Sequence, residues 1–380
     1  MNNIPRTVSF SGALLERMKR EGLSEQMQKS LREKAEAYLS SPLYAVTERM
    51  TRAVSGNVHD YCSIGTYWWP NPNTENGLPY IRRDGYASPA ATDTITYDAM
   101  TQKAFTLALA AYYFDELKYA EAAEKALYDW HLNPETYMTP HAEYSQAIPG
   151  ICSGRGIGII DFSMRSYRVY DAISILKYLG KITEERVAEY GDWYNKFTDW
   201  MLTSENGLEE ECEPNNHGTY FDVHLLATAI FTNRPALVKK VCTTAYERRI
   251  ISQIEPDGSQ PLELLRTKAM IYSLSNNWAH SLLANMAASQ GYTKYWGENS
   301  KFGDNAIKKA IDFLYPYYEY PETFPYEEIK FGTVHLYMAR MLSVLDAHFP
   351  NEDYGARAKA IIEAYADKTS LPEWLYYPLK

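Results

Sequence analysis

Residues 215–224 read Asn-Asn-His-Gly-Thr-Tyr-Phe-Asp-Val-His, and the interpretation of the whole sequence starts from this segment. Pro214 and the Asn pair are typical of a helix start, because asparagine side chains cap backbone N–H groups that lack a partner inside the helix. Apolar residues at helical spacing follow, at Phe221, Leu225, Ala229 and Ile230. A helix start needs one capping side chain, so the two asparagines, His217 and Tyr220 together indicate a further role.

The composition is that of a soluble globular protein. Of the 380 residues, 46% are hydrophobic and 23% are charged, and the chain contains 33 Tyr and 8 Trp. Exposed aromatic rings stack on the faces of sugars, which favours a carbohydrate ligand, while a tyrosine-rich core explains the same counts more simply. The net charge of −10 argues against a broad basic surface, so we expect no nucleic-acid partner.

The four cysteines are scattered, without a CxxC pair or zinc-ligand spacing, and this predicts free buried thiols. They are Cys62, Cys152, Cys212 and Cys242. No stretch approaches the ~20 apolar residues of a membrane span, and the first residues contain no apolar signal region. We expect a periplasmic or secreted protein whose signal peptide is absent from this sequence, with a cytoplasmic location still open and the oligomeric state unknown.

Helical periodicity recurs along most of the sequence. A first helical block is predicted at Leu14–Leu39, with Ser24 as an N-cap inside it. The other predicted helices are Thr92–Phe114, Tyr119–Trp130, Phe162–Leu179, Thr183–Thr203, Gly218–Thr232, Pro235–Ile250, Glu263–Ser273, Asn277–Gln290, Asp304–Tyr315, Thr333–Phe349 and Tyr354–Asp367.

The fold class follows from this succession of helices. Almost no segment alternates apolar and polar residues as a half-buried strand would. Helical hairpins joined mainly by short turns, without a low-complexity linker, predict one all-α domain over residues 1–380. We expect the hairpins to form an (α/α) toroid, an incomplete barrel whose long loops line a central cleft. A helical repeat solenoid is the competing architecture, but the sequence has no fixed repeat period.

Two loops exceed the ~12–15 residues that unstructured connectors rarely pass without a functional reason. The first, Asn57–Ala91, carries adjacent aromatic residues and a pair of arginines, namely Tyr67, Trp68, Trp69, Arg82 and Arg83. Rings for stacking and guanidinium groups for carboxylates suit a platform for a sugar acid. The alternative is a loop that folds onto the core through its Trp residues, with one of the arginines paired to Asp84.

The second loop, Asn133–Asp161, contains closely spaced glycines at Gly154, Gly156 and Gly158. They do not match a dinucleotide-binding fingerprint, because the third glycine comes one position early and no βαβ pattern surrounds it. We expect instead that they let the backbone pass close to a packed neighbour. Gln146 and Arg155 of the same loop are candidate substrate contacts.

The acidic run from Glu209 to Glu213 invites a metal-site interpretation. Such runs are usually solvated helix faces, and no histidine stands at metal-ligand spacing from this one. We therefore expect neither a metal nor another cofactor.

A second group of candidate residues lies about fifty positions further along the chain. Arg266 follows a turn into a helix, and Tyr272 comes six residues later. Six residues along an α-helix turn through about 600°, so the two side chains share a face only if the helix breaks or bends. Taken singly, Arg266 is more often an ion-pair partner, for example of Glu263, and a lone Tyr or His is usually structural.

Together these groups match the needs of one reaction. β-Elimination in a uronic acid polymer removes the proton α to a carboxylate, and that proton is nearly inert until the carboxylate charge is neutralised. Carboxamide N–H groups and a guanidinium can supply this electrostatic stabilisation without a metal. A His or Tyr must then take the proton, and an acid must protonate the departing glycosidic oxygen.

The motifs resemble those of the alginate lyase superfamily with an (α/α) toroid, and most of all polysaccharide lyase family thirty-eight, whose members cleave glucuronan or alginate. The resemblance covers about residues 55–345. It rests on the Asn-Asn-His segment and on five further segments, namely 67–72, 78–85, 146–150, 156–161 and 261–267. It implies a lyase that acts on an anionic polysaccharide, a polyuronate.

The resemblance also implies roles for single residues. His217 is the base, and Tyr272 is the acid or acts as both base and acid. Asn215 or Asn216, together with Arg266, holds the substrate carboxylate. If base and acid lie on the same face of the sugar, as for mannuronate, Tyr272 does both; otherwise His217 abstracts the proton, as for guluronate or glucuronate.

Substrate contacts are expected from the two loops and from the helix start, and the residues are Tyr67, Trp68, Trp69, Arg82, Arg83, Gln146, Arg155 and Tyr220. His224 stands where many relatives have glutamine, and packing is its expected role. Two other classes stay open. An (α/α) glycoside hydrolase would need two catalytic carboxylates, for which Glu263 and Asp222 are nominal candidates. A non-catalytic glycan-binding protein could use the same aromatic loops.

Overall fold

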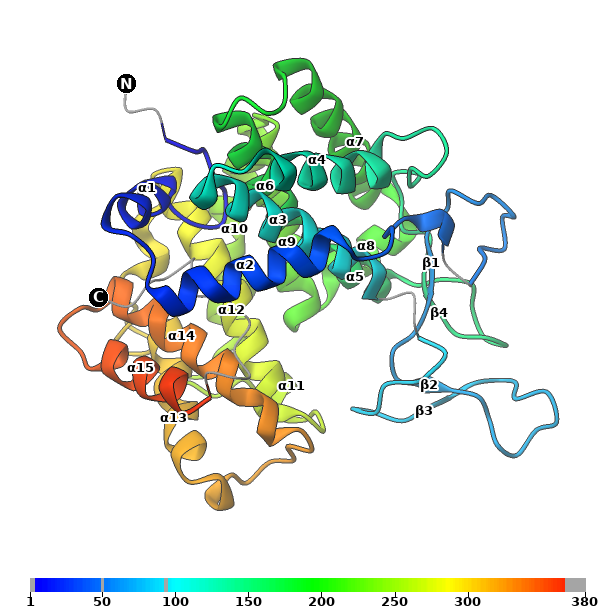
Figure 1. Ribbon diagram of the computed structural model, residues 1–380. Coiled ribbons are helices and arrows are strands. Elements are labelled where there is room, and N and C mark those ends of the chain that lie inside the picture. Colours follow the sequence, from blue (N-terminus) through cyan, green and yellow to red (C-terminus); the bar gives the residue numbers. More distant parts are fainter. Residues whose placement is uncertain (1–3, 49–50, 92–94, 366–380) are drawn as a thin grey trace. The chain divides into compact units, whose positions relative to one another are not determined.

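The computed structural model describes residues 4–48, 51–91 and 95–365, most of them helical (Figure 1). The predicted helix start at Thr92 and the predicted helix end at Asp367 lie outside these residues. None of the described helices is long and apolar enough to cross a lipid bilayer.

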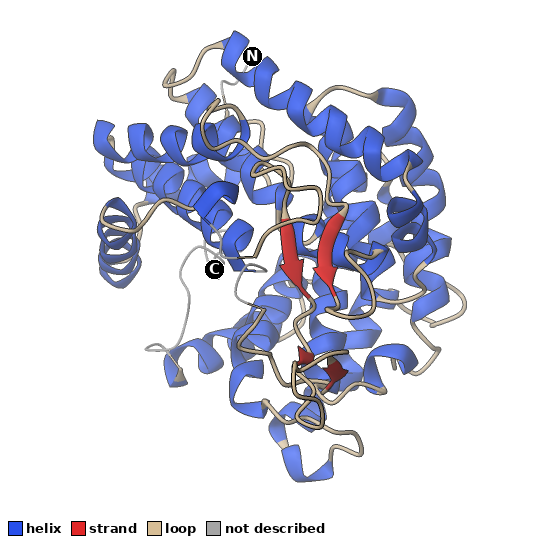
Figure 2. Cartoon of the chain, turned by 90° about the vertical axis from the view of Figure 1, so that its right-hand side faces the viewer, coloured by secondary structure: helices blue, strands red, loops and turns tan. Residues whose placement is uncertain are grey.

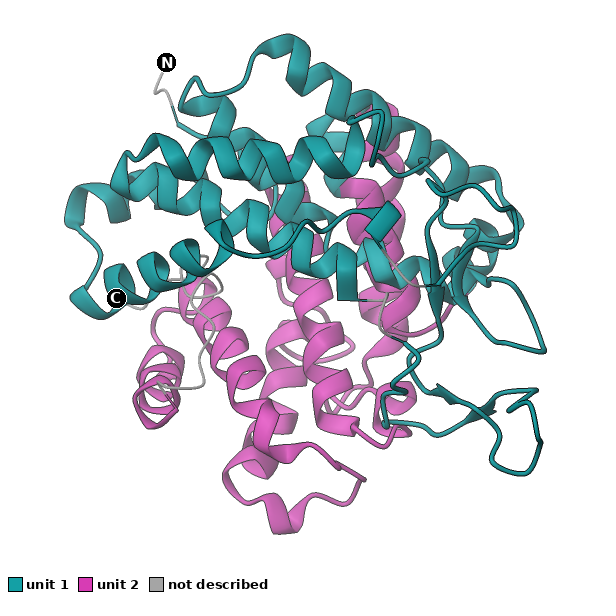
Figure 3. Ribbon diagram, turned by 45° about the vertical axis from the view of Figure 1, so that its right-hand side comes forward, with its two compact units in different colours: residues 1–212, 227–234 teal, residues 213–226, 235–380 magenta. Residues whose placement is uncertain are grey.

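The chain divides into two compact units (Figure 3). The first contains residues 1–212 and 227–234, and the second contains residues 213–226 and 235–380. Helix α9 (Asn216–Phe231) begins in the second unit, and its last turns belong to the first. The single domain over residues 1–380 stays a prediction.

The first unit is built around α3, which packs against α2, α4 and α6. Its helices are α1 (Gly12–Glu21), α2 (Glu25–Leu39), α3 (Thr96–Phe114), α4 (Leu117–His131), α5 (Ile160–Ser163), α6 (Ser166–Tyr178), α7 (Glu184–Thr203) and α8 (Glu205–Cys212). The predicted first block is thus two helices. Gly22 ends α1 with a φ of 85°, and Ser24 caps α2 by accepting a hydrogen bond from the Met27 N–H at 3.3 Å.

Tyrosines fill much of the core of the first unit. The hydroxyl of Tyr194 lies 2.8 Å from that of Tyr97 and 2.9 Å from Nε2 of His131, and all three side chains are buried. Burial lowers the pKa of His131 to about 4, so its imidazole is neutral at physiological pH. For these residues, the tyrosine-rich core is the correct explanation of the composition.

Both long loops contain short strands, which form two small two-stranded sheets (Figure 2). Strand β1 (Cys62–Ile64) pairs in parallel with β4 (Tyr144–Ala147), so the two loops are joined by backbone hydrogen bonds. Strand β2 (Trp68–Trp69) pairs antiparallel with β3 (Ile81–Arg82) inside the first loop. This second sheet holds the predicted aromatic and arginine residues side by side.

In the second unit α12 packs against α13 and α14, and α14 packs against α15. The helices are α10 (Pro235–Ala245), a π-helix at Tyr246–Ile251, α11 (Pro261–Leu264), α12 (Ala269–Ser289), α13 (Ala306–Glu319), α14 (Val334–His348) and α15 (Tyr354–Ala364). Asn305 caps α13 by accepting hydrogen bonds from two backbone N–H groups, those of Ile307 and Lys308.

The predicted helices Glu263–Ser273 and Asn277–Gln290 were wrong in their boundaries. The break lies earlier, after α11, because the backbone between α11 and α12 pairs with a distant segment: the Ile329 N–H donates to Thr267 O at 3.0 Å. The polar residues taken as a break, around Asn276, lie inside α12 with their side chains buried.

A buried ion pair fixes α9 against the π-helix. The Asp222 carboxylate accepts hydrogen bonds from Arg248 at 2.5 Å and from Arg249 Nε at 2.7 Å. Asp222 is fully buried and the Arg249 side chain is 2% exposed, so neither charge can turn to solvent instead. This pair determines where the first turns of α9 lie.

We predict that Asp222→Ala lowers the free energy of unfolding by about 3–5 kcal/mol, because it leaves a buried guanidinium without its carboxylate. Denaturant unfolding followed by circular dichroism measures this loss. The control is Asp199→Ala, which removes an exposed carboxylate paired with Arg234 and should change stability far less. Equal effects of the two substitutions would contradict the structural role of Asp222.

Candidate active site

Asn215 is the N-cap of α9. Its Oδ1 accepts the backbone N–H of His217 at 2.9 Å, and its Nδ2 donates to the Glu213 carboxylate at 3.0 Å. The first asparagine of the pair therefore has the local capping role that the sequence pattern allowed for one of them.

Asn216 has a different partner, the carboxylate of Glu263 on α11. Its backbone N–H donates to Oε1 at 2.7 Å, and its Nδ2 lies 3.0 Å from Oε1 and 2.9 Å from Oε2. Both side chains are almost fully buried. Burial raises the pKa of the Glu263 carboxyl, while the hydrogen bonds from Asn216, the charge of Arg266 and a protonated His217 oppose this shift.

Gly218 leaves room for the guanidinium that lies beneath the helix start. A Cβ atom at this position would lie 2.2 Å from Nη1 of Arg249 and 2.1 Å from the Glu213 carbonyl oxygen. Arg249 Nη1 donates to that same carbonyl at 2.9 Å. Glycine is required here by packing, so the motif's fourth residue contributes to the position of the site and not to its chemistry.

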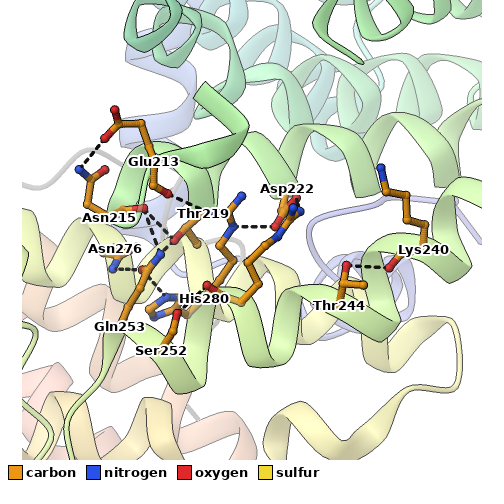
Figure 4. A network of polar contacts seen from close by, with 12 residues as sticks. Glu213, Asn215, Thr219, Asp222, Lys240, Thr244, Ser252, Gln253, Asn276 and His280 are labelled. Atoms are coloured by element: carbon orange, nitrogen blue, oxygen red, sulfur yellow. Dashed lines mark hydrogen bonds and ion pairs between the residues drawn. The ribbon is translucent and has the colours of Figure 1, made fainter. Parts of the chain in front are cut away.

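Gln253 holds the other side of the helix start (Figure 4). Its Oε1 accepts hydrogen bonds from Thr219 Oγ1 at 2.9 Å and from Asn276 Nδ2 at 2.8 Å, and it lies 3.2 Å from His280 Nε2. Its Nε2 donates to the Asn215 carbonyl at 3.2 Å. This buried network ties α9 to α12.

Arg266 and Tyr272 meet despite their unfavourable spacing. Arg266 Nη2 donates to the Tyr272 hydroxyl at 3.0 Å, and the guanidinium carbon lies 4.0 Å from the centre of the Tyr272 ring. The contact is possible because α11 ends at Leu264 and α12 begins only at Ala269. The sequence spacing allowed this contact only if the helix breaks between the two residues, and the structure contains such a break.

A cavity of about 200 Å³ lies beside the residues that precede α9 and beside α11. Its lining includes Asn215, Glu263 and three buried carboxamides, those of Gln253, Gln260 and Asn276. Thus α9, α11 and the start of α12 place a carboxamide, an imidazole, a guanidinium and a phenol in one region of the second unit.

The aromatic platform of the first unit is formed by strands β2 and β3. The Arg83 guanidinium lies over the Trp69 ring at 4.5 Å and near the Tyr86 ring at 5.6 Å. Arg82 forms an ion pair with Asp84 at 2.7 Å. The alternative interpretation of the loop, in which one of its two arginines pairs with Asp84, is therefore correct for Arg82. Tyr67, Trp68 and Trp69 are all half-buried, so each retains accessible ring surface.

Gln146 and Arg155 form a second polar group in this unit. Gln146 has a positive φ of 49°, and its Nε2 donates to the buried Asp161 at 2.8 Å. Arg155 donates from Nε to the Gln146 carbonyl at 2.9 Å and from Nη2 to Gln146 Oε1 at 3.0 Å. The carboxamide of Gln146 is therefore occupied within the protein, and Arg155 is the group that it holds in place.

Among the described residues, no carboxylate forms an ion pair with Arg155. Its guanidinium is half-buried, and burial lowers its pKa from the usual arginine value. It lies 5.9 Å from the centre of the Trp68 ring, close to Gly65, where a Cβ atom would come within 2.8 Å of Arg155 Nη2.

Two further motif residues are structural in their placement. Tyr220 is 1% exposed and donates its hydroxyl to the Ser275 carbonyl at 2.9 Å, a position that does not favour contact with a substrate. His224 is fully buried, and burial lowers its pKa to about 3. Packing, the expected role of His224, agrees with this placement.

The glycines of the second loop behave as expected. A Cβ at Gly154 would lie 1.9 Å from the Glu143 carbonyl, and one at Gly158 would lie 2.5 Å from the Ser145 carbonyl. The prediction that the acidic run from Glu209 to Glu213 is a solvated helix face was partly wrong. Glu209 accepts the Gly156 N–H at 2.9 Å, and Glu210 is fully buried in α8, a helix that the sequence reading missed.

The four cysteines are free, as predicted, but only Cys62 and Cys242 are buried; Cys152 is half-buried and Cys212 is exposed. Within the described ranges, no group of three or more His, Cys, Asp or Glu side chains is arranged to hold a metal ion.

Several residues of the site escaped the sequence reading, above all Glu263 as a partner of Asn216, and also Gln253, Arg249 and Asp161. A buried carboxylate or glutamine has no local sequence signature. The one available signal was the position of Glu263 three residues before Arg266 in a matched motif.

Comparisons with known proteins agree on one family. The alginate lyase family model matches residues 46–324. A crystal structure of an alginate lyase from Bacteroides ovatus is 31% identical, with coverage of 99% of this chain and 100% of that one and a TM-score of 0.91. None of the curated proteins gives a significant match.

Two more distant structures share the fold. Alginate lyase A1-III from Sphingomonas species A1 is 14% identical, with coverage of 89% of this chain and 92% of that one and a TM-score of 0.55. A histidine-to-alanine variant of A1-III, complexed with a tetrasaccharide, is 14% identical, with coverage of 93% and 91% and a TM-score of 0.59. These matches confirm the predicted all-α toroid fold.

The capping role of Asn215 can be tested separately from chemistry. We predict that Asn215→Ala lowers the free energy of unfolding by about 1 kcal/mol, because α9 loses its capping oxygen. Asn215→Ser keeps a capping hydroxyl and should lose much less. Denaturant titration of both variants provides the measurement, and an alanine variant as stable as the serine variant would exclude the capping role.

Proposed function

This chain belongs to the alginate lyase family, and we propose that it cleaves a uronic acid polymer, alginate or glucuronan, by β-elimination. Membership makes it an enzyme, a polysaccharide lyase. The Bacteroides ovatus relative is described as an alginate lyase, and the A1-III variant was solved with a tetrasaccharide, which supports a polyuronate as the substrate. The predicted assignment to family thirty-eight and the periplasmic or secreted location stay predictions.

The proposed reaction needs no water in the bond-breaking step. The proton α to the uronate carboxylate is removed, its electron pair forms a carbon–carbon double bond, and the bond to the glycosidic oxygen on the adjacent ring carbon breaks. The oxygen then takes a proton. The products are a new reducing end and an unsaturated uronate at the non-reducing end.

We assign neutralisation of the substrate carboxylate to Asn216 and Arg266. Asn215 is the weaker candidate because its Oδ1 caps α9 and its Nδ2 donates to Glu213. A guanidinium and an amide N–H that are already in place stabilise the growing charge without reorganisation, and this is the main source of catalysis in such sites.

The observation that carries the proposal is the contact between Arg266 and Tyr272. A guanidinium 3.0 Å from the phenolic oxygen stabilises negative charge on that oxygen. Tyr272 can thereby give up a proton to the leaving oxygen, and it can also act as a base. A carboxylate-binding group and a proton-transferring group stand in direct contact, as an elimination requires.

The division of labour between His217 and Tyr272 depends on the uronate. For mannuronate, Tyr272 removes the proton and returns it on the same face of the sugar. For guluronate or glucuronate, His217 removes the proton and Tyr272 donates from the other face. Both residues belong to the second unit.

The glycoside hydrolase alternative loses support from the same contacts. Its two nominal carboxylates are engaged elsewhere: Glu263 binds Asn216, and Asp222 binds Arg248 and Arg249. Both are buried, whereas hydrolysis needs two carboxyl groups that reach the glycosidic bond and a water or sugar carbon.

We propose that the polymer also contacts the first unit, through the Trp69–Arg83 platform and through Arg155. Arginine binds carboxylates with a planar, two-pronged geometry, and aromatic rings stack on sugar faces. Within this group Arg155 is the contact, and Gln146 acts by holding it.

We predict that the wild-type enzyme produces the absorbance of unsaturated uronates from polymannuronate, polyguluronate or glucuronan. Tyr272→Phe should abolish this signal while it leaves the circular dichroism spectrum and polymer binding largely intact, because only the proton-carrying oxygen is lost. The control is Tyr320→Phe, which changes an exposed tyrosine in the same way. Turnover by Tyr272→Phe at the wild-type rate would remove this residue from the mechanism.

We predict that Arg155→Ala raises KM for the polymer about tenfold or more and changes kcat less, because the lost interaction serves binding in ground and transition states alike. Steady-state kinetics measures the two constants. Arg234→Ala, which removes another half-buried arginine, one paired with the exposed Asp199, is the matched control. A KM that does not change would show that Arg155 makes no substrate contact.

A further inference from the structure

One buried side chain of the site takes no part in the proposed reaction. Glu263 is 2% exposed, and none of the proposed steps uses its carboxylate as a base, an acid or a nucleophile. Burial of a carboxylate costs free energy unless the group is well hydrogen-bonded. The contacts of Glu263 therefore indicate what it does.

Those contacts all lead to Asn216. The carboxylate accepts the backbone N–H at 2.7 Å, and the side-chain Nδ2 lies within 3.0 Å of both of its oxygens. The two N–H bonds of a carboxamide point in different directions. The two oxygens of one carboxylate lie too close together for each to accept a well-aligned hydrogen bond from a different N–H. One N–H of Nδ2 thus points at Glu263, and the other remains available for a different acceptor.

The charge of the carboxylate determines which way the carboxamide faces. An ionised carboxylate only accepts hydrogen bonds, so it binds the nitrogen of Asn216 and repels the oxygen. A carboxamide rotated by half a turn would bring Oδ1 against the carboxylate oxygens. Asn216 is thereby fixed with its nitrogen towards Glu263, and its second N–H has a defined direction.

We propose that Glu263 is a positioning residue that holds Asn216 so that the free amide N–H meets the carboxylate of the uronate undergoing elimination. This inference rests on the proposed function. The Glu263 carboxylate orients the carboxamide of Asn216, which is the neutralising group. Its contact with the Asn216 backbone N–H fixes the position of the first residue of α9.

The electrostatic surroundings keep this arrangement consistent. Burial raises the pKa of Glu263, and the hydrogen bonds from Asn216 and the charge of Arg266 offset part of this rise in favour of the ionised form that selects the amide nitrogen. Glu263 also lies three residues before Arg266 and accepts, through its backbone carbonyl, the Arg266 N–H at 3.1 Å. The two neutralising groups are thus anchored to one short segment.

The test is a double-mutant cycle on turnover of the polyuronate that the wild-type enzyme cleaves. Glu263→Gln keeps the volume of the side chain but removes its exclusive acceptor character, and it should lower kcat about 10–100-fold with KM nearly unchanged. Asn216→Ala should lower kcat at least as much. If Glu263 acts through Asn216, the double variant will be no slower than Asn216→Ala alone.

Glu255→Gln is the matched control, since Glu255 is an exposed carboxylate on the rim of the same cavity and should leave turnover unchanged. Thermal unfolding of each variant shows whether it is folded. The positioning role would be overturned if the double variant lost kcat by the product of the two single losses. It would also be overturned if a folded Glu263→Gln variant turned over the polymer at the wild-type rate. Failure of the wild-type enzyme to form unsaturated product would instead refute the proposed function.

Discussion

The site depends on the hydrogen bonds between the buried carboxylate of Glu263 and Asn216. This carboxylate lies at the end of the four-residue helix α11 and binds both the backbone and the side chain of Asn216, the first residue of α9. Because an unpartnered carboxylate would be costly at this depth, the two segments are held together wherever Glu263 stays ionised. Asp222, six residues after Asn216 on α9, adds a second buried pair with Arg249, so the helix start is fixed in position and in rotation.

The break between α11 and α12 brings the two proposed catalytic side chains Arg266 and Tyr272 together beside this anchored helix start. A continuous helix would have placed Arg266 and Tyr272 on different faces. The non-helical residues between Leu264 and Ala269 instead bring the guanidinium 3.0 Å from the phenolic oxygen. The interrupted segment is stabilised by the backbone hydrogen bond from the Ala269 N–H to Glu327 O.

Local features of this chain could be predicted from sequence, and long-range ones could not. Ser24 as a cap, and one asparagine of the 215–216 pair as a cap, follow from local chemistry, and the close spacing of the glycines in the second loop predicted their tight packing. The pairing of Asn216 with Glu263 joins residues 47 positions apart, and the break before α12 depends on residues beyond position 320, so neither has a local signal. The predicted helix break around Asn276 was wrong because polar residues normally lie at a surface or in a turn, whereas Asn276 is buried inside α12. The family resemblance brought together the site residues that spacing alone could not connect.

The most direct test of the account is the mass of the oligosaccharides released from a polyuronate, since elimination and hydrolysis differ by one molecule of water. Mass spectrometry of a digest by the wild-type enzyme should find fragments from the chain interior that are one water lighter than the saturated oligosaccharides, each with an unsaturated non-reducing end. Digests by Tyr272→Phe should contain only intact polymer. A digest by the wild-type enzyme in which the interior fragments are saturated too would contradict β-elimination and the roles given to Arg266 and Tyr272.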